Sequence, residues 1–209
     1  MCYSAEVSLL TFTIGFGFSI LLTMRTHKYH KLLGYFLGFV SLMQFIEFLL
    51  WRHQICDTYH KSLSVLGMIL NHAQPVILAL VTAYIYRKNI NAIVIIALIY
   101  LAIIIPYSAQ YTNELQCSNV IPWSRNFNYN PHLVWNWNNM SYSTLVYSVF
   151  LAAFVGIALV GMPQSEGRTF ALIAVLTYTG SSLIYERNVV GSLWCFWVAF
   201  IPAIIYLLN

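Results

Sequence analysis

Seven apolar stretches, each long enough to cross a lipid bilayer, dominate this sequence of 209 residues. A helix needs about 20 mostly apolar residues to span a hydrocarbon core of roughly 30 Å. The sequence therefore predicts an all-α, polytopic transmembrane helix bundle of about seven spans. They run approximately over Val7–Met24, Leu32–Trp51, Ser62–Tyr86, Ile90–Tyr107, Tyr142–Met162, Thr169–Tyr185 and Val189–Leu208.

Composition supports the same class of protein. Hydrophobic residues make up 60% of the chain and charged residues 8%, whereas a soluble domain carries about 25% charged residues. A soluble fold of this size could not hide so much apolar surface from water. The predicted partner is therefore the lipid bilayer. The chain has a net charge of +4 but no run of basic residues. The sequence therefore gives no indication of a nucleic-acid partner.

The distribution of Lys and Arg predicts the orientation in the membrane, because cytosolic loops are enriched in both. Six basic residues fall in the short loops on one side: Arg25, Lys28, Lys31, Arg87, Lys88 and Arg168. We therefore expect an outer N-terminus and a cytosolic C-terminus. The sequence predicts an integral multi-pass protein and does not distinguish the plasma membrane, an endomembrane or a virion membrane.

Other features of the predicted outer side agree with that orientation. Asn139 begins an Asn-Met-Ser acceptor sequence for glycosylation, close to the fifth span. All six tryptophans fall on the outer side, as membrane-interface anchors would. The four cysteines lie there too, where an oxidising compartment favours disulfides. They are Cys2, Cys56, Cys117 and Cys195, and they allow three pairings between which the sequence does not choose.

Polar residues inside the apolar stretches are costly and usually face a partner or a cavity. The second stretch places Gln44, Glu47 and Trp51 on one helical face. The third carries a polar cluster near the membrane midplane, beside Pro75. We predict an outward-facing polar cavity with Glu47 and His72 at its centre. Its candidate ligand-binding residues are Gln44, Glu47, Trp51, Asn71, His72, Gln74, Tyr178, Ser182, Glu186 and Trp194.

A second interpretation of these residues is structural. Polar side chains in helix bundles often only hold helices together. Glu47 would then be a packing partner of His72 or Tyr178, and Glu186 would pair with Arg187 or face solvent at the interface. The cluster from Asn71 to Pro75 is denser than helix packing requires, which favours a cavity.

The outer loop after the second stretch contains His53, Cys56 and His60. On a continuing helix these three side chains would share a face at a spacing that suits zinc. The alternative is a disulfide between Cys56 and Cys117, which the oxidising outer side favours. We therefore predict no metal and keep the zinc site as the less favoured alternative. The long loop 108–141 is aromatic and is expected to form a packed outer cap or a lid.

The chain forms a single predicted transmembrane domain, 1–209, with weak internal repetition. Segments 7–86 and 142–208 are candidate parallel repeats joined by the span 90–107, an arrangement that builds transporters. In span number, length and outer N-terminus the chain resembles the small sugar-transporter and lumenal-retention-receptor superfamily. The Pro-Gln pair of that group appears once, as Pro163-Gln164, at a helix end. No binding residue is carried over.

The N-terminal string Met1-Cys2-Tyr3-Ser4-Ala5 resembles a family of uncharacterised multispan proteins of roughly 200 residues from large DNA viruses and unicellular eukaryotes. These proteins begin with Met-Cys-aromatic-Ser-Ala, and the stretches Gln44–Trp51, Asn71–Pro75 and Gly191–Cys195 resemble the same pattern. The resemblance implies the membrane class and no activity.

Three functions are weighed on this basis. The first is a transporter or binder of a small polar or cationic molecule. The second is a structural or partner-binding membrane protein without a ligand. An intramembrane hydrolase is third, because His72 is the single histidine within the seven stretches and a catalytic zinc needs more ligands. The sequence identifies no cofactor, ligand or oligomeric state.

Overall fold

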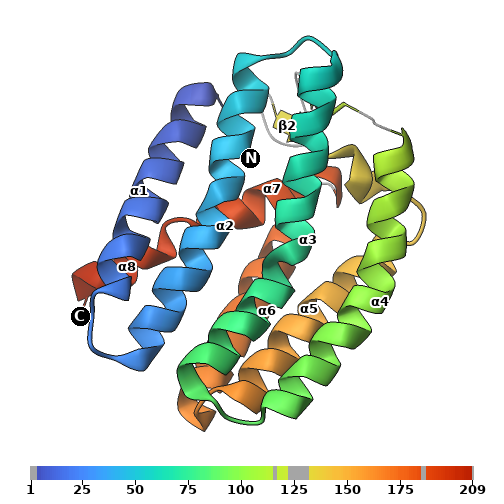
Figure 1. Cartoon of the computed structure of the whole chain (residues 1–209). Helices are drawn as coiled ribbons and strands as arrows, with labels where there is room; N and C mark the ends of the chain where they lie inside the picture. Colours follow the sequence, from blue (N-terminus) through green and yellow to red (C-terminus); the bar gives the residue numbers. More distant parts are fainter. Residues whose placement is uncertain (1–3, 115–116, 122–131, 185–186, 209) are drawn as a thin grey trace.

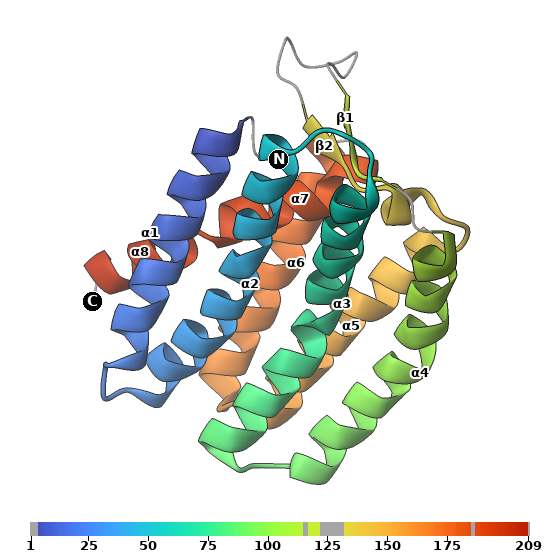
Figure 2. The ribbon, with the colours of Figure 1, turned by 45° about the horizontal axis from the view of Figure 1, so that its top comes forward.

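The computed structural model describes residues 4–114, 117–121, 132–184 and 187–208. Helices α1 to α6 run along a common bundle, and α7 and α8 run across it (Figures 1 and 2). A two-stranded antiparallel sheet and a short 3₁₀ helix lie at one end of the bundle, which we call the cap end. The elements are α1 Ala5–Thr23, α2 Lys28–Arg52, α3 Thr58–Tyr86, α4 Ile90–Glu114, β1 Asn119–Ile121, β2 His132–Val134, η1 Asn136–Asn139, α5 Ser143–Gly161, α6 Gln164–Ile184, α7 Arg187–Val198 and α8 Ile201–Leu208.

Five helices in the described part of the chain are long and apolar enough to cross a membrane: α1 to α5. Large apolar side chains cover their outward faces, for example Leu10, Leu80 and Leu98. Such a surface is stable only in contact with lipid. The chain is therefore an integral multi-pass membrane protein. The prediction of seven similar spans is only partly confirmed, and the sidedness of the N-terminus remains a prediction.

Helices α1 and α2 pack closely because small residues line their contact. Gly34 and Gly38 of α2 are four residues apart, in the Gly-x-x-x-Gly spacing that lets helix backbones approach in membranes. A β-carbon at Gly34 would lie 2.7 Å from the Ser19 carbonyl oxygen and 2.8 Å from the Thr23 backbone nitrogen of α1. The Ser4 hydroxyl caps the start of α1, where it accepts a hydrogen bond from the Val7 backbone N–H.

Two prolines lie inside continuous helices. Pro75 is in α3 and Pro106 is in α4. We expected the fourth span to end at Tyr107 and a loop to begin at residue 108. That boundary is wrong, because α4 continues to Glu114. Proline removes one backbone donor, and membrane helices tolerate this loss when neighbouring groups satisfy the freed carbonyl.

The predicted seventh span, Val189–Leu208, is wrong as a single helix. It is divided into α7 and α8, with the break at residues 199–200. Pro202 cannot donate to the Val198 carbonyl, which explains the interruption. The break lies at mid-length of the α1–α2 pair, since a β-carbon at Gly15 would lie 2.7 Å from the Ala199 carbonyl oxygen.

The broken segment runs across the bundle, from the cap-end layer to the α1–α2 pair (Figures 1 and 2). At the cap end, a β-carbon at Gly191 of α7 would lie 3.2 Å from the Trp135 ring. At the opposite end, the Arg25 guanidinium lies 4.5 Å from the centroid of the Tyr206 ring of α8. The α7–α8 segment therefore crosses obliquely, as a discontinuous helix.

The cap end is a packed layer in its described parts. Asn119–Ile121 pairs with His132–Val134, and the disulfide Cys56–Cys117 joins this layer to the loop between α2 and α3. The Trp135 and Trp137 rings stack with centroids 4.8 Å apart. Both rings are fully buried, so the expectation that all tryptophans are membrane-interface anchors is wrong for these two.

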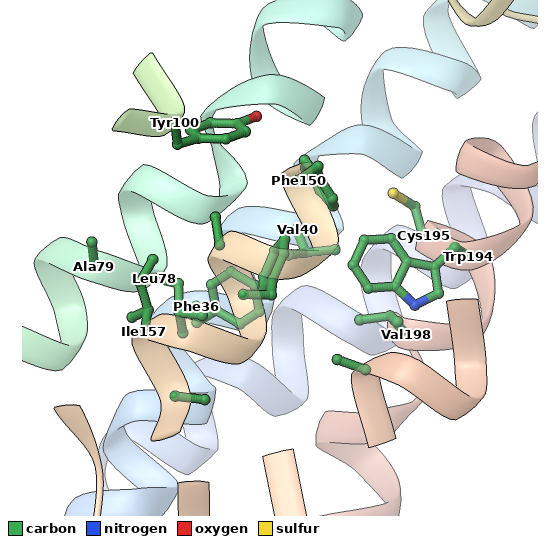
Figure 3. Close-up of a cluster of buried hydrophobic side chains, with 14 of the residues drawn as sticks. Phe36, Val40, Leu78, Ala79, Tyr100, Phe150, Ile157, Trp194, Cys195 and Val198 are labelled. Carbon is green, nitrogen blue, oxygen red and sulfur yellow. The ribbon is translucent and has the colours of Figure 1, made fainter. Parts of the chain in front are cut away.

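The main apolar core lies where α2, α3, α5 and α7 meet (Figure 3). Figure 3 shows Phe36 and Val40 of α2 near Phe150 of α5, with Trp194 and Val198 on α7. The Phe150 and Trp194 rings meet edge to face at 5.7 Å between centroids. Trp194 is thus a core residue and not an interface anchor. Dense aromatic contacts hold the crossing segment against the long helices.

Candidate functional site

The polar cluster predicted in the third span is fully buried in α3 and faces three different helices. Asn71, His72 and Gln74 are between 0% and 4% exposed. Their side chains contact α5, α4 and α7 respectively. Buried polar groups in a membrane bundle need such partners, because neither water nor lipid supplies them at this depth. The cluster is therefore a connecting point for the bundle.

Asn71 begins a chain of hydrogen bonds that leads to the cap. Its Nδ2 donates to the Tyr147 hydroxyl at 3.0 Å, and that hydroxyl donates to the Asn138 side-chain oxygen in η1. All three groups are buried. The middle of α3 is thereby coupled to the position of the 3₁₀ helix at the cap end.

His72 joins α3 to α4. Its Nδ1 lies 2.8 Å from the Ser108 hydroxyl oxygen, and its backbone carbonyl accepts a hydrogen bond of 2.8 Å from the Tyr100 hydroxyl. The Tyr107 ring meets the imidazole edge to face, with centroids 5.8 Å apart. Ser108 can make this contact only because α4 continues past Pro106.

The predicted polar face of α2 is also present. Gln44 and Glu47 are fully buried, and Trp51 is partly buried. The Glu47 carboxyl lies within electrostatic range of the Cys195 thiol of α7. This face therefore points toward the crossing segment.

A polar pocket with a volume of about 310 Å³ lies between α5, α6 and α7 near the cap end. Hydroxyl groups dominate its wall. Among the described residues, this wall contains no Asp, Glu, Lys, Arg or His. The residues that form it are Asn138, Ser143, Thr144, Tyr147, Ser148, Tyr178, Ser182, Val190 and Gly191.

The candidate residues divide between different places. Tyr178 and Ser182 belong to the polar pocket. Gln74 and Trp194 belong to a separate apolar pocket. Glu47 and His72, predicted at the centre of the cavity, are in the wall of neither pocket. Glu186 lies outside the described residues.

Sequence reasoning missed the contribution of α5 to the polar pocket. Hydroxyl groups occupy positions i, i+1, i+4 and i+5 of this segment, which lie on one face of a helix. These residues are Ser143, Thr144, Tyr147 and Ser148. That hydroxyl stripe was the available signal. It was missed because hydroxyl groups in an apolar stretch carry little cost and look like helix-packing residues.

The zinc alternative at His53, Cys56 and His60 is not formed. Cys56 is oxidised in the disulfide with Cys117, as the preferred interpretation predicted. His53 Nε2 lies 2.8 Å from the Asp57 carboxylate, and His60 Nε2 lies 2.7 Å from the Ser118 carbonyl oxygen. Within the described ranges, no three His, Cys, Asp or Glu side chains are grouped to hold a metal ion.

Asp57 organises this loop. Its side chain caps α3 by accepting a hydrogen bond of 3.0 Å from the His60 backbone N–H. That bond, with the contact from the His53 ring, holds the pKa of Asp57 below its ordinary value. The residue therefore stays ionised over the physiological pH range.

The other predicted modifications have separate outcomes. Cys195 is a buried free thiol, so its predicted part in a disulfide is wrong. Its sulfur lies 3.6 Å from the Gln74 Nε2. Cys2 lies outside the described residues. Asn139 is the last residue of η1, four positions before α5, and its glycosylation remains a prediction.

Comparison with family models, with curated proteins and with solved structures gives no match to this chain. The functional argument therefore depends on the chemistry of the pockets.

Proposed function

We propose that this membrane protein binds a small, uncharged, hydroxyl-rich molecule in the polar pocket at the cap end, as a transporter or a membrane-bound receptor. One observation carries the proposal: seven of the nine wall residues carry a hydroxyl or amide group, and the described wall has no charged side chain. A neutral polyol can exchange hydrogen bonds with such a wall without an unpaired charge.

The hydrogen bonding inside the wall leaves groups for a ligand. Ser148 and Ser182 donate to the carbonyls of Thr144 and Tyr178 in their own helices. Each hydroxyl oxygen still has a lone pair to accept from a ligand. Thr144, Ser148 and Ser182 are exposed, so the pocket is open to incoming molecules. The structure therefore favours the polar, uncharged part of the sequence hypothesis over a cationic ligand.

The discontinuous helix favours transport within this proposal. Val190 and Gly191 of α7 form part of the pocket wall, and the same segment is interrupted at residues 199–200. Discontinuous helices that line a binding site are a recurring feature of secondary transporters. The α7 half would transmit occupancy of the pocket to the break.

The test is equilibrium binding to purified protein in lipid nanodiscs, with a panel of radiolabelled monosaccharides, polyols and amino acids. Tyr178→Phe and Ser182→Ala each remove one wall hydroxyl, and each is expected to weaken binding of the preferred neutral compound about threefold to tenfold. Ser62→Ala is the matched control, because this exposed hydroxyl bonds the Thr58 carbonyl of its own helix outside the pocket. Equal loss in the control, or no binding by any compound, would refute the proposal.

A structural role without a ligand is the second candidate function. It is favoured by the internal partners of the α3 cluster, where Asn71, His72 and Gln74 each bond a different helix. The two functions differ in one result. Under the structural role, Tyr178→Phe and Ser182→Ala leave every binding measurement unchanged, and only variants of the α3 cluster lower the folded yield.

A further inference from the structure

A groove with a volume of about 240 Å³ follows the contact between α1 and α2 on the outer surface of the bundle. Figures 1 and 2 show α1 at the edge of the bundle, beside α2. Ile20 and Tyr35 in the groove wall are 43% and 48% exposed, so the groove is open to the surroundings. The other large side chains of the wall are Phe16, Phe39 and Leu42. An apolar groove on the membrane-facing surface of these helices is in contact with lipid.

Small residues form the floor of this groove. Gly34 and Gly38 of α2 lie in it, where the α1 and α2 backbones approach closely. The larger side chains stand on either side of that contact and leave a narrow channel between them. From Gly34 to Leu42 the channel runs about 12 Å along α2, at 1.5 Å per residue. A narrow, unbranched acyl chain is the part of a lipid that has this shape.

Two lysines continue the same face of α2 beyond the groove, at the end opposite the cap. Lys28, Lys31 and Tyr35 are separated by three and four residues, which places them on one helical face. Lys28 is exposed and Lys31 is half-buried. The ion pair found in the described part of the chain joins His53 and Asp57. Neither lysine therefore has an acidic partner there, and both can bind an external anion.

The start of α2 adds to this positive region. Its N-cap residue, His27, makes no side-chain capping bond, and the first turn contains no acidic residue. The first backbone N–H groups of a helix lack partners within the helix and attract phosphate groups. The acidic residue at this end, Glu166 of α6, accepts a hydrogen bond from the Tyr86 hydroxyl. The beginning of α2 thus remains suited to an anion from outside the chain.

The Ser19 hydroxyl in the groove wall also has an unmet hydrogen bond. Ser19 is 1% exposed, and its hydroxyl has no partner among the described residues, whereas the Thr23 hydroxyl donates to the Ile20 carbonyl at 2.7 Å. Ser19 lies beside Gly38, about 10 Å along α2 from Lys31. The ester groups of a phospholipid lie just inside a headgroup layer roughly 5–8 Å thick. An ester carbonyl would therefore reach the depth of Ser19 when the phosphate is near Lys31.

We infer that this groove binds an anionic phospholipid from the bilayer. One acyl chain lies in the channel between α1 and α2, and the phosphate contacts Lys28, Lys31 and the start of α2. A zwitterionic headgroup is a poorer occupant, because its own ammonium group is repelled by the two lysines. The predicted orientation places this end of the bundle in the cytosol, and the cytosolic leaflet is the one that carries anionic lipids.

The test is photo-cross-linking in phosphatidylcholine nanodiscs, with peptide mapping by mass spectrometry. The probes are phosphatidylglycerol and phosphatidylcholine with the same diazirine-bearing acyl chain. We expect labelling of residues 16–23 and 34–42, with phosphatidylglycerol labelling them at least about fivefold more strongly. Unlabelled phosphatidylglycerol should displace the probe, whereas inorganic phosphate should not displace it relative to chloride at equal ionic strength.

Charge variants separate the site from general attraction to the membrane surface. Lys28→Gln and Lys31→Gln should each lower labelling by phosphatidylglycerol about fivefold and leave labelling by phosphatidylcholine unchanged. Lys31→Arg keeps the charge and should retain the labelling. The matched control is Lys88→Gln, which removes an exposed charge at the same end of the bundle, in the loop between α3 and α4. It should leave the groove labelling unchanged.

Three results in the native protein would overturn the inference. They are equal labelling by the two lipids, cross-links that map away from the groove, and displacement of the probe by inorganic phosphate, which would identify a soluble anion as the occupant. None of them depends on a variant that must fold. Ser182→Ala, in the polar pocket, is expected to leave the labelling unchanged, which keeps this inference separate from the proposed function.

Discussion

The contact between α1 and α2 permits a quantitative test of the fold through one methyl group. In Gly34→Ala the new β-carbon would lie 2.7 Å from the Ser19 carbonyl oxygen and 2.8 Å from the Thr23 nitrogen. Both atoms belong to the backbone of α1, so no side-chain rotation relieves the overlap. The helices must separate, and overpacking of this kind costs about 1–3 kcal/mol. The intrinsic gain of Ala over Gly in a helix offsets about 0.5–1 kcal/mol of that cost.

Two neighbouring glycines make the prediction a graded series. A β-carbon at Gly38 would lie 3.3 Å from the Ser19 β-carbon, and one at Gly17 would meet nothing within 4 Å. We therefore expect Gly34→Ala to lower the free energy of unfolding by about 1–2 kcal/mol and Gly17→Ala to leave it unchanged or raise it by up to about 1 kcal/mol. Gly38→Ala should fall between them.

The measurement is reversible unfolding in mixed micelles of dodecyl maltoside and sodium dodecyl sulfate, followed by tryptophan fluorescence. The order of the three midpoints is the decisive result. If Gly34→Ala unfolds at the same midpoint as Gly17→Ala, the close approach of α1 and α2 is wrong.

Three further predictions follow from other contacts. Cys56→Ser should lower the free energy of unfolding by up to about 4 kcal/mol, the chain-entropy value for a loop of 61 residues. In thermal melts, reductant should lower the melting temperature of the native protein by the same amount as the substitution does, and should leave that of Cys56→Ser unchanged. The pKa of Asp57 is lowered in the folded protein. Its contribution to stability is therefore complete above the ordinary pKa of 3.8 and is lost as the pH falls through the lower, folded value. Thermal melts between pH 2 and pH 6 should show that loss in the native protein and not in Asp57→Asn. Tyr147→Phe leaves the side chains of Asn71 and Asn138 without their shared partner and should cost about 1–3 kcal/mol, whereas additive effects of Tyr147→Phe and Asn71→Ala in a double-mutant cycle would contradict the hydrogen-bonded chain.

The apolar stretches predicted the positions of the long helices well, because span length is set by the bilayer and is visible in composition. Prolines were the main source of error. Pro75 and Pro106 remain inside helices, while Pro202 lies beside a break. Local sequence does not distinguish these cases, because the outcome depends on which distant group meets the disturbed backbone. The Tyr100 hydroxyl that bonds the His72 carbonyl, one turn before Pro75, is such a group.

The candidate site was predicted in its residue types more than in its arrangement. Burial of Gln44, Glu47, Asn71, His72 and Gln74 follows from their positions in apolar helices. Their grouping into one cavity did not follow, because spacing along one helix shows which residues share a face and not which neighbour covers that face. The polar pocket is formed instead where α5 and α6 meet α7, three helices whose mutual positions depend on the crossing segment.

The disulfide has a consequence for how the protein is made. Cys56 lies between the second and third helices, and Cys117 follows the fourth. The bond can therefore close only after four helices have been synthesised, and only if both cysteines emerge on the same, oxidising face of the membrane. A chain that inserted its third and fourth helices as an inverted hairpin would leave both thiols on the other, reducing face, where the bond does not form. Closure of this bond thus distinguishes correctly inserted chains from inverted ones before the remaining helices are in place.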